Sequence, residues 1–270
     1  MVYPKISGKL LRVFCYLLFF ATFPAYAQRT IGDIAVPSGF KRIERETDTF
    51  AKYLRGLELR SESTVYLFNG NPKSYQGAQY AVINMDVGSR DLQQCADAVM
   101  RLKAEYHFQL NQYDKIHFNF TNGDRVDFVS YAHGYRPSII GNKVSWNKTA
   151  KEDFSYSTFR KYLNLIYSYA GSYSLSREMI PVPSVNSLEI GQVFIQGGFP
   201  GHAVIVVDLA INEQGEKVFM LAQSYMPAQD IHVLKNPRNR ELSPWYSLEN
   251  GDELLTPEWK FQSEDLKKFR

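Results

Sequence analysis

The sequence predicts an α+β fold in which helices pack on a mostly antiparallel sheet. Helical periodicity dominates the first part of the chain, whereas strand patterns are concentrated after it. The clearest strand pattern is GGFPGHAVIVVDLAINEQGEKVFMLAQSY at residues 197–225. Its two apolar runs, separated by a short polar loop, are typical of a β-hairpin.

The first 27 residues predict a cleaved signal peptide. An apolar run at 13–20 follows three basic residues and precedes the small-residue motif Ala-Tyr-Ala at 25–27. The run is too short to span a bilayer. The basic residues are Lys5, Lys9 and Arg12. We therefore expect an exported protein, periplasmic or extracellular, whose mature chain begins near Gln28.

The mature chain is predicted to carry no net charge. Removal of three of the 31 Lys and Arg residues leaves 28, which equals the 28 Asp and Glu residues. This balance argues against nucleic acid or anionic membrane as the main partner. No later apolar run is long enough for membrane insertion. We expect a monomer with a single α+β domain over 28–270, a core at about 45–235 and a polar C-terminal segment that wraps the surface.

Three segments have the apolar spacing of helices. A cap at Thr47-Asp48 begins the first, at 50–57, and residues 89–108 form the clearest one. The third covers 159–167 and ends near Gly171.

Strands are predicted at several shorter segments. A hairpin is indicated at 116–120 and 126–129 by the Asn122-Gly123 turn between them. The long segment 133–152 is rich in Gly, Pro, Asn and Lys and predicts a loop. The other predicted strands are 65–68, 80–87, 188–195, 203–207, 218–222 and 231–234.

Cys95 is the single cysteine of the predicted mature chain, which excludes an intramolecular disulfide. It falls in or just beyond the first turn of the predicted 89–108 helix. The positive end of a helix dipole lowers the pKa of a thiol there and favours the nucleophilic thiolate. Cys95 also belongs to the apolar stripe of this helix, so an inert core cysteine is the alternative.

His202 heads the first strand of the 197–225 hairpin, after a turn of Gly and Pro. Gln223 lies across the hairpin, within a residue or two of the position opposite His202, and could orient the imidazole. Asp208 is on the same strand but about 20 Å away, which is too far to do so. Cys95, His202 and Gln223 are therefore the candidate catalytic residues.

Further residues complete the candidate site. The Gln94 side chain, with the backbone N–H of Cys95, is the candidate oxyanion donor. Gly201, Tyr225 and Trp245 are candidates to line a substrate groove. No zinc-type spacing and no nucleotide-binding motif occurs, so we expect no metal and no cofactor.

The chain resembles two groups of proteins. The order Cys95, His202, Gln223, with QCADAV, LEIGQVFI and GHAVIVVD, is similar to NlpC-type and CHAP-type cysteine hydrolases and implies a papain-like fold. Gln192 and Gln223 depart from the residues usual there. DLQQCADAVMRLKAEY, GGFPGHAVIVVDLA and LAQSYMPAQDIHVLKNP resemble an exported bacterial family, the domain of unknown function 4846, over nearly the whole mature chain. That family brings no activity with it, so function must come from the site.

Three hypotheses about function follow. The first is an extracytoplasmic cysteine hydrolase that cleaves an amide bond. Peptidoglycan-like peptides are the substrate class that the resemblance implies. The second is a catalytically inactive envelope protein of the same fold that binds a peptide or glycan. The third assigns Cys95 to the core alone.

Overall fold

The fold is seen in a computed structural model, which describes Met1 and residues 30–44, 49–249 and 251–270. The rest of the predicted signal peptide, residues 2–27, and the predicted helix cap Thr47-Asp48 lie outside the described residues. None of the helices in the described part of the chain is long and apolar enough to cross a membrane.

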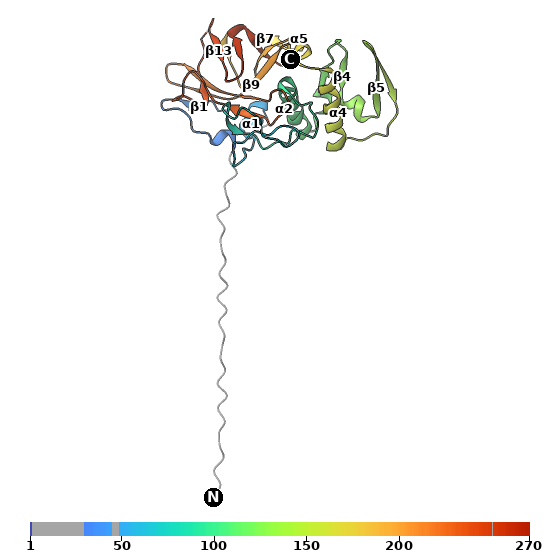
Figure 1. Ribbon diagram of the computed structural model, residues 1–270, viewed down its shortest axis with the longest axis horizontal. Coiled ribbons are helices and arrows are strands. Elements are labelled where there is room, and N and C mark those ends of the chain that lie inside the picture. The colour runs from blue at the N-terminus through green and yellow to red at the C-terminus, as the bar shows by residue number, and fades with distance from the viewer. Residues whose placement is uncertain (2–29, 45–48, 250) are drawn as a thin grey trace.

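A nine-stranded antiparallel sheet forms the centre of the molecule (Figure 1). The predicted mostly antiparallel α+β architecture is thereby confirmed. The strands run in the order β2 (Gln79–Val82), β11 (His232–Leu234), β10 (Lys217–Gln223), β9 (His202–Ile211), β8 (Val193–Gln196), β15 (Leu266–Lys268) and β7 (Ile180–Pro181), with β1 (Lys41–Arg42) on β9 and β12 (Trp245–Tyr246) on β10.

The predicted central hairpin is β9–β10. Ala222 lies opposite Ile205, and the register shifts between Met220 and Leu221. Residues 202–210 of β9 are all buried. Because both faces of this strand are covered, its sequence is a continuous apolar run rather than an alternating one.

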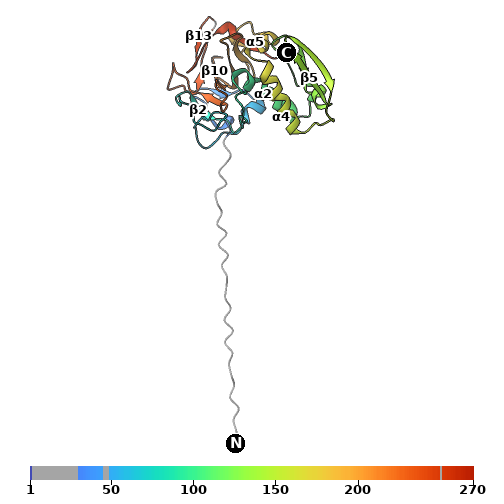
Figure 2. The same ribbon diagram turned by 45° about the vertical axis from the view of Figure 1, so that its right-hand side comes forward.

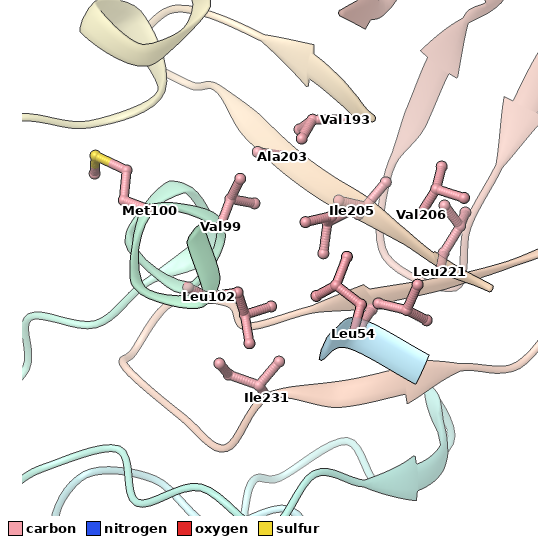
Figure 3. Close-up of a cluster of buried hydrophobic side chains, with 14 of the residues drawn as sticks. Leu54, Val99, Met100, Leu102, Val193, Ala203, Ile205, Val206, Leu221 and Ile231 are labelled. Carbon is pink, nitrogen blue, oxygen red and sulfur yellow. The ribbon is translucent and has the colours of Figure 1, made fainter. Parts of the chain in front are cut away.

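Helix α2 (Cys95–Gln109) packs across the sheet at β9. Figure 3 shows Val99 of this helix directed toward Ala203 and Ile205 of the strand, whereas Leu102 lies nearer Ile231 and Leu54. The helix was predicted to begin at or before Asp91, but Cys95 is its first residue. Residues 89–94 are not helical because Asp91 accepts hydrogen bonds from Gln94 and from the Ala228 backbone N–H instead.

Helix α4 and the β5 hairpin lie to one side of α2, and β13 lies to the other side, as Figures 1 and 2 show. The remaining helices are α1 (Phe50–Arg55), α3 (Phe128–Ala132), α4 (Tyr156–Tyr169) and α5 (Ser172–Glu178), with one-turn 3-10 helices η1 (Ile31–Asp33), η2 (Tyr113–Lys115), η3 (Val185–Ser187) and η4 (Ser263–Asp265). Separate hairpins are β3 (His117–Asn119) with β4 (Arg125–Asp127), β5 (Tyr135–Ile140) with β6 (Lys143–Lys148), and β13 (Glu253–Leu255) with β14 (Lys260–Gln262).

Several segments differ from their predictions. The predicted strand 65–68 forms only isolated bridges, Tyr66 with Pro72 and Leu67 with Gln229, and the predicted strand 126–129 ends at Asp127, where α3 begins.

The predicted loop 133–152 contains the β5–β6 hairpin, whose strands are mostly exposed and therefore lack an apolar pattern. Residues 235–270 were expected to wrap the surface. They instead supply β12 and β15 to the central sheet, and Leu266 of β15 is fully buried opposite Phe194 of β8. Strands this short carry too little periodicity to be read from sequence.

Candidate active site

The candidate site lies at the end of the sheet where β9 begins and β10 ends. Ala222 pairs with Ile205, so continuing the ladder places Tyr225 opposite His202. The two rings are in contact, with centroids 4.9 Å apart. Helix α2 begins beside the same end of β9, which brings Cys95 to this place.

Gln223 orients the imidazole of His202, as the sequence predicted. His202 Nε2 lies 2.8 Å from Gln223 Oε1. The other end of the amide, Nε2, donates to Oε2 of Glu258 at 2.7 Å. A carboxylate only accepts hydrogen bonds, so the amide oxygen must face the ring. His202 therefore carries its proton on Nε2, and Nδ1 is left with a free lone pair.

A salt bridge fixes the far end of this chain of hydrogen bonds. Lys73 Nζ lies 2.6 Å from Glu258 Oε2, and both side chains are largely withdrawn from solvent. The same ammonium group lies 5.6 Å from the ring centre of Tyr225. The successive contacts from Lys73 to Glu258, from Glu258 to Gln223 and from Gln223 to His202 fix the orientation of the imidazole ring.

Aromatic rings enclose His202. Trp259 and Phe261 lie 5.3 and 5.8 Å from it, centroid to centroid, in addition to Tyr225. The Trp259 indole donates to Gln196 on β8, which anchors the ring. His202 is 1% exposed, and burial lowers its pKa to about 4. The imidazole is therefore neutral at physiological pH.

Cys95 is the first residue of α2, as the helix-dipole argument requires. The backbone N–H groups of Ala96, Ala203 and Cys95 itself act on the sulfur, and each lowers the pKa of the thiol. Ala203 directly follows His202, so the thiol lies beside the strand residue that neighbours the imidazole. Cys95 thus lies against the neighbour of His202, and a direct contact between the thiol and the imidazole stays a prediction.

Burial outweighs these favourable N–H groups. It raises the pKa of the Cys95 thiol to about 11, with a further contribution from Asp97. Burial also raises the pKa of Asp97, to about 8. No hydrogen bond joins the thiol to His202 among the residues that the structure describes. The resting site thus holds a neutral thiol and a neutral imidazole, not the low-pKa thiolate that the dipole argument alone predicted.

The other predicted site residues near the end of β9 have distinct places. Gln94, the candidate oxyanion donor, uses its side-chain nitrogen on Asp91 at 3.2 Å. At Gly201, a Cβ would lie 2.6 Å from the carbonyl oxygen of Gly198 and 2.7 Å from that of Gln196, so glycine is needed for packing. Tyr225 is half-buried over His202 and is the predicted groove residue that does contact the site.

Trp245 does not reach the site, and its placement in a substrate groove was wrong. It pairs with Met220, which lies opposite Asp208, about 20 Å along β9 from His202. Trp245 is 1% exposed, and its indole donates to the carbonyl of Ala35. Its aromatic surface belongs to the core.

Asp208 has a structural role. Its carboxylate is fully buried and lies 2.7 Å from a guanidinium nitrogen of Arg42 and 2.7 Å from one of Arg55. Of the two residues considered as partners for His202, only Gln223 makes that contact.

Sequence reasoning missed Lys73, Glu258 and Trp259. They lie in irregular segments far from positions 95, 202 and 223, and no local pattern sets them apart from other surface residues. The pairing of β15 with β8 and the hydrogen bonds of Trp259 and Asp265 to Gln196 bring the C-terminal segment back to the site. Within the described residues, no group of His, Cys, Asp and Glu is arranged to hold a metal ion.

Comparison with known families covers nearly the whole described chain. Residues 31–268 match the model of a family described as "Domain of unknown function (4846)". The chain belongs to this family. The matched region includes Cys95 and His202 as well as the C-terminal segment with Glu258.

No curated protein and no solved structure matches the chain. The resemblance to NlpC-type and CHAP-type hydrolases, and the papain-like fold that it implied, find no support in these comparisons. The architecture that stands is a mixed α/β fold with mostly antiparallel sheets.

Proposed function

We propose that this protein is a cysteine hydrolase that cleaves an amide bond. The observation that carries the proposal is the hydrogen bond from His202 Nε2 to Gln223 Oε1, which fixes the tautomer and leaves the Nδ1 lone pair available as a base. Cys95, the first residue of α2, lies against the backbone N–H of Ala203, the residue that follows His202. A nucleophile, a base and a group that orients the base are the three parts that thiol catalysis needs.

The proposed reaction has two steps. Sγ of Cys95 attacks the substrate carbonyl carbon while Nδ1 of His202 takes the thiol proton. The imidazole then gives that proton to the leaving amine, and the carbon–nitrogen bond breaks to leave a thioester. Water, deprotonated by the same nitrogen, hydrolyses the thioester and regenerates the thiol. Gln223 keeps the Nε2 proton in place throughout.

Backbone groups supply the oxyanion donors in this proposal. The side chain of Gln94 is held by Asp91, whereas the first N–H groups of α2 have no partner within the helix. The backbone N–H of Cys95 is therefore the better donor for the negative oxygen of the tetrahedral intermediate.

The site is closed at rest. Cys95 and His202 are buried, and the half-exposed ring of Tyr225 covers the imidazole. A substrate would enter by displacing Tyr225. Exposed Phe199 and Met226, in the loops that flank His202 and Tyr225, offer apolar contacts to the arriving chain. The proposal therefore predicts a low activity that rises when Tyr225 is reduced to alanine.

Peptides of the cell wall are the proposed substrate class. This part of the proposal rests on the predicted signal peptide and on the resemblance of the GHAVIVVD motif to wall hydrolases. It gives the protein a peptidoglycan-like partner and a periplasmic or extracellular location.

Digestion of purified peptidoglycan tests the proposal. Mass spectrometry should detect new amine and carboxyl ends with the wild-type protein and none with Cys95→Ser. Gln214→Ala, in the exposed loop between β9 and β10, is the matched control and should keep activity. Equal product from wild type and Cys95→Ser would end the hydrolase proposal.

A binding protein without catalysis is the second candidate. The neutral, buried thiol, with its pKa of about 11, is the observation that favours it. In that case Phe199, Met226 and Tyr75 would form an exposed contact surface. Sedimentation with peptidoglycan would then be unchanged in Cys95→Ser but weakened in Phe199→Ser, with no cleavage by either protein.

A further inference from the structure

A cavity lies near the C-terminal end of α2, away from the candidate site. Its volume is about 740 Å³, and its walls come from α2, the β3–β4 hairpin, the end of α5 and the last residues of the chain. Lys103, in its wall, is eight residues after Cys95 and so lies roughly 12 Å further along the helix axis. The volume is in the range of small-molecule sites.

The walls of this cavity are rich in cationic side chains. Five line it, against the two acids Asp114 and Glu178. Of these five cationic side chains, Arg125 alone forms an ion pair among the described residues. Its partner, Asp127, does not line the cavity. The five are Lys103, Lys115, Arg125, Arg177 and Arg270.

The hydrogen-bond and ring partners of the other cations are neutral, although the Glu178 carboxyl lies close enough to Arg125 and Arg270 for both to lower its pKa. Arg177 donates to the hydroxyl of Tyr173 at 2.9 Å, and Arg270 donates to the backbone carbonyl of Glu178 at 3.1 Å. The Lys103 ammonium lies over three aromatic rings, 4.7 Å from the centroid of Phe50 and 5.4 Å from that of Phe269. These contacts hold the side chains in place but do not neutralise them.

Titratable groups in the cavity experience this excess positive charge. Burial and Lys115 lower the pKa of Lys103 to about 8. Burial and Arg125 lower the pKa of His117. Burial and both lysines lower the pKa of His107, whereas the hydrogen bond that its ring Nδ1–H donates to Gln112 Oε1 raises it. Three groups on two elements, Lys103 and His107 of α2 and His117 of β3, thus respond to neighbouring positive charge in addition to burial.

We propose that this cavity binds a small polyanion that carries carboxylate or phosphate groups. Such a ligand would supply negative charge opposite the lysines and arginines that have no ion pair. Its oxygens would accept charge-assisted hydrogen bonds from these side chains. Arg177 and Arg270 offer forked donors suited to either oxyanion. The site is separate from Cys95, so its occupancy does not depend on the hydrolase proposal.

Calorimetric titration of the full chain at low salt tests the proposal, with pyrophosphate and citrate as probes. We expect at least one probe to bind and its affinity to fall about tenfold or more in Lys115→Gln/Arg177→Gln, because two charge-assisted contacts are lost. Both side chains are exposed, so the variant should fold. The control Arg240→Gln removes an exposed arginine outside the cavity and should bind as wild type.

The two probes distinguish the source of the ligand. Tighter binding of pyrophosphate assigns a phosphate ligand, and tighter binding of citrate assigns a carboxylate one. Binding of either should also slow acetylation of Lys103, measured by mass spectrometry. The proposal is overturned if neither probe binds, if the double variant binds as well as wild type, or if Lys103 is acetylated equally with and without the bound probe.

Discussion

The imidazole nitrogen Nε2 of His202 lies 2.8 Å from the amide oxygen of Gln223, and the same amide donates to Glu258. One side chain thus connects the candidate base to a buried ion pair with Lys73. The amide can satisfy both neighbours in only one orientation, which is why a glutamine can take the orienting role here.

Replacing Gln223 by leucine should destabilise the protein by about 3 kcal/mol, because His202 Nε2 and the Glu258 carboxylate each lose a buried partner. Urea unfolding followed by circular dichroism measures the change. Gln214→Leu, at an exposed loop position, is the control and should stay within about 0.5 kcal/mol of wild type. Equal stability of the two variants would contradict a stabilising role for the hydrogen bonds of the Gln223 amide to His202 and Glu258.

Asp208→Asn should be among the most destabilising single changes, at about 3–5 kcal/mol. It leaves Arg42 and Arg55 without their buried counter-charge. The comparison is Asp127→Asn, whose ion pair with Arg125 is exposed and should contribute less than about 1 kcal/mol. Thermal or urea unfolding of the pair measures the difference. A loss at Asp208 no larger than that at Asp127 contradicts the structural role assigned to this carboxylate.

The stability difference between wild type and His232→Gln should depend on pH. Burial lowers the folded-state pKa of His232 to about 3, so the unfolded chain binds the extra proton between pH 6.5 and about 3. Wild type therefore loses stability relative to the variant as pH falls below 6.5, by about 1.4 kcal/mol per pH unit.

Unfolding at pH 7 and pH 5 measures this difference. Asp97 and Glu178, whose pKa values burial raises to about 8 and about 7, act in the opposite direction, but they do so in both proteins and cancel. His133→Gln, the same substitution at an exposed histidine, is the control for effects on stability that do not depend on burial of the imidazole. A difference between wild type and His232→Gln that is the same at both pH values contradicts the buried, neutral imidazole.

Much of the site is predictable from sequence because its residues lie in strongly patterned segments. The Cys95 helix and the hairpin with His202 and Gln223 have long apolar periodicities. Helix position and strand register are therefore enough to place these three residues near one another. The bond from Gln223 to His202 is the direct confirmation of that register.

The rest of the site depends on burial and on distant pairings, which local patterns do not encode. Nothing around Glu258 or Lys73 predicts a strand or a helix, and both reach the site only through tertiary contacts. Trp245 was misplaced because an aromatic residue in a polar segment is equally compatible with a surface groove and with a core contact. The thiol pKa was misjudged because desolvation exceeds the effect of the helix N-terminus.

The rate at which iodoacetamide alkylates Cys95 at pH 7 tests the central claim, that the imidazole of His202 can take the thiol proton. Mass spectrometry measures this rate in wild type and in His202→Gln, with the urea-unfolded proteins as the reference for intrinsic reactivity. The account predicts that His202→Gln lowers the rate in the folded protein by about tenfold or more, because the base is removed. Equal rates, or a faster rate in the variant, would contradict it and leave Cys95 as a residue of the core.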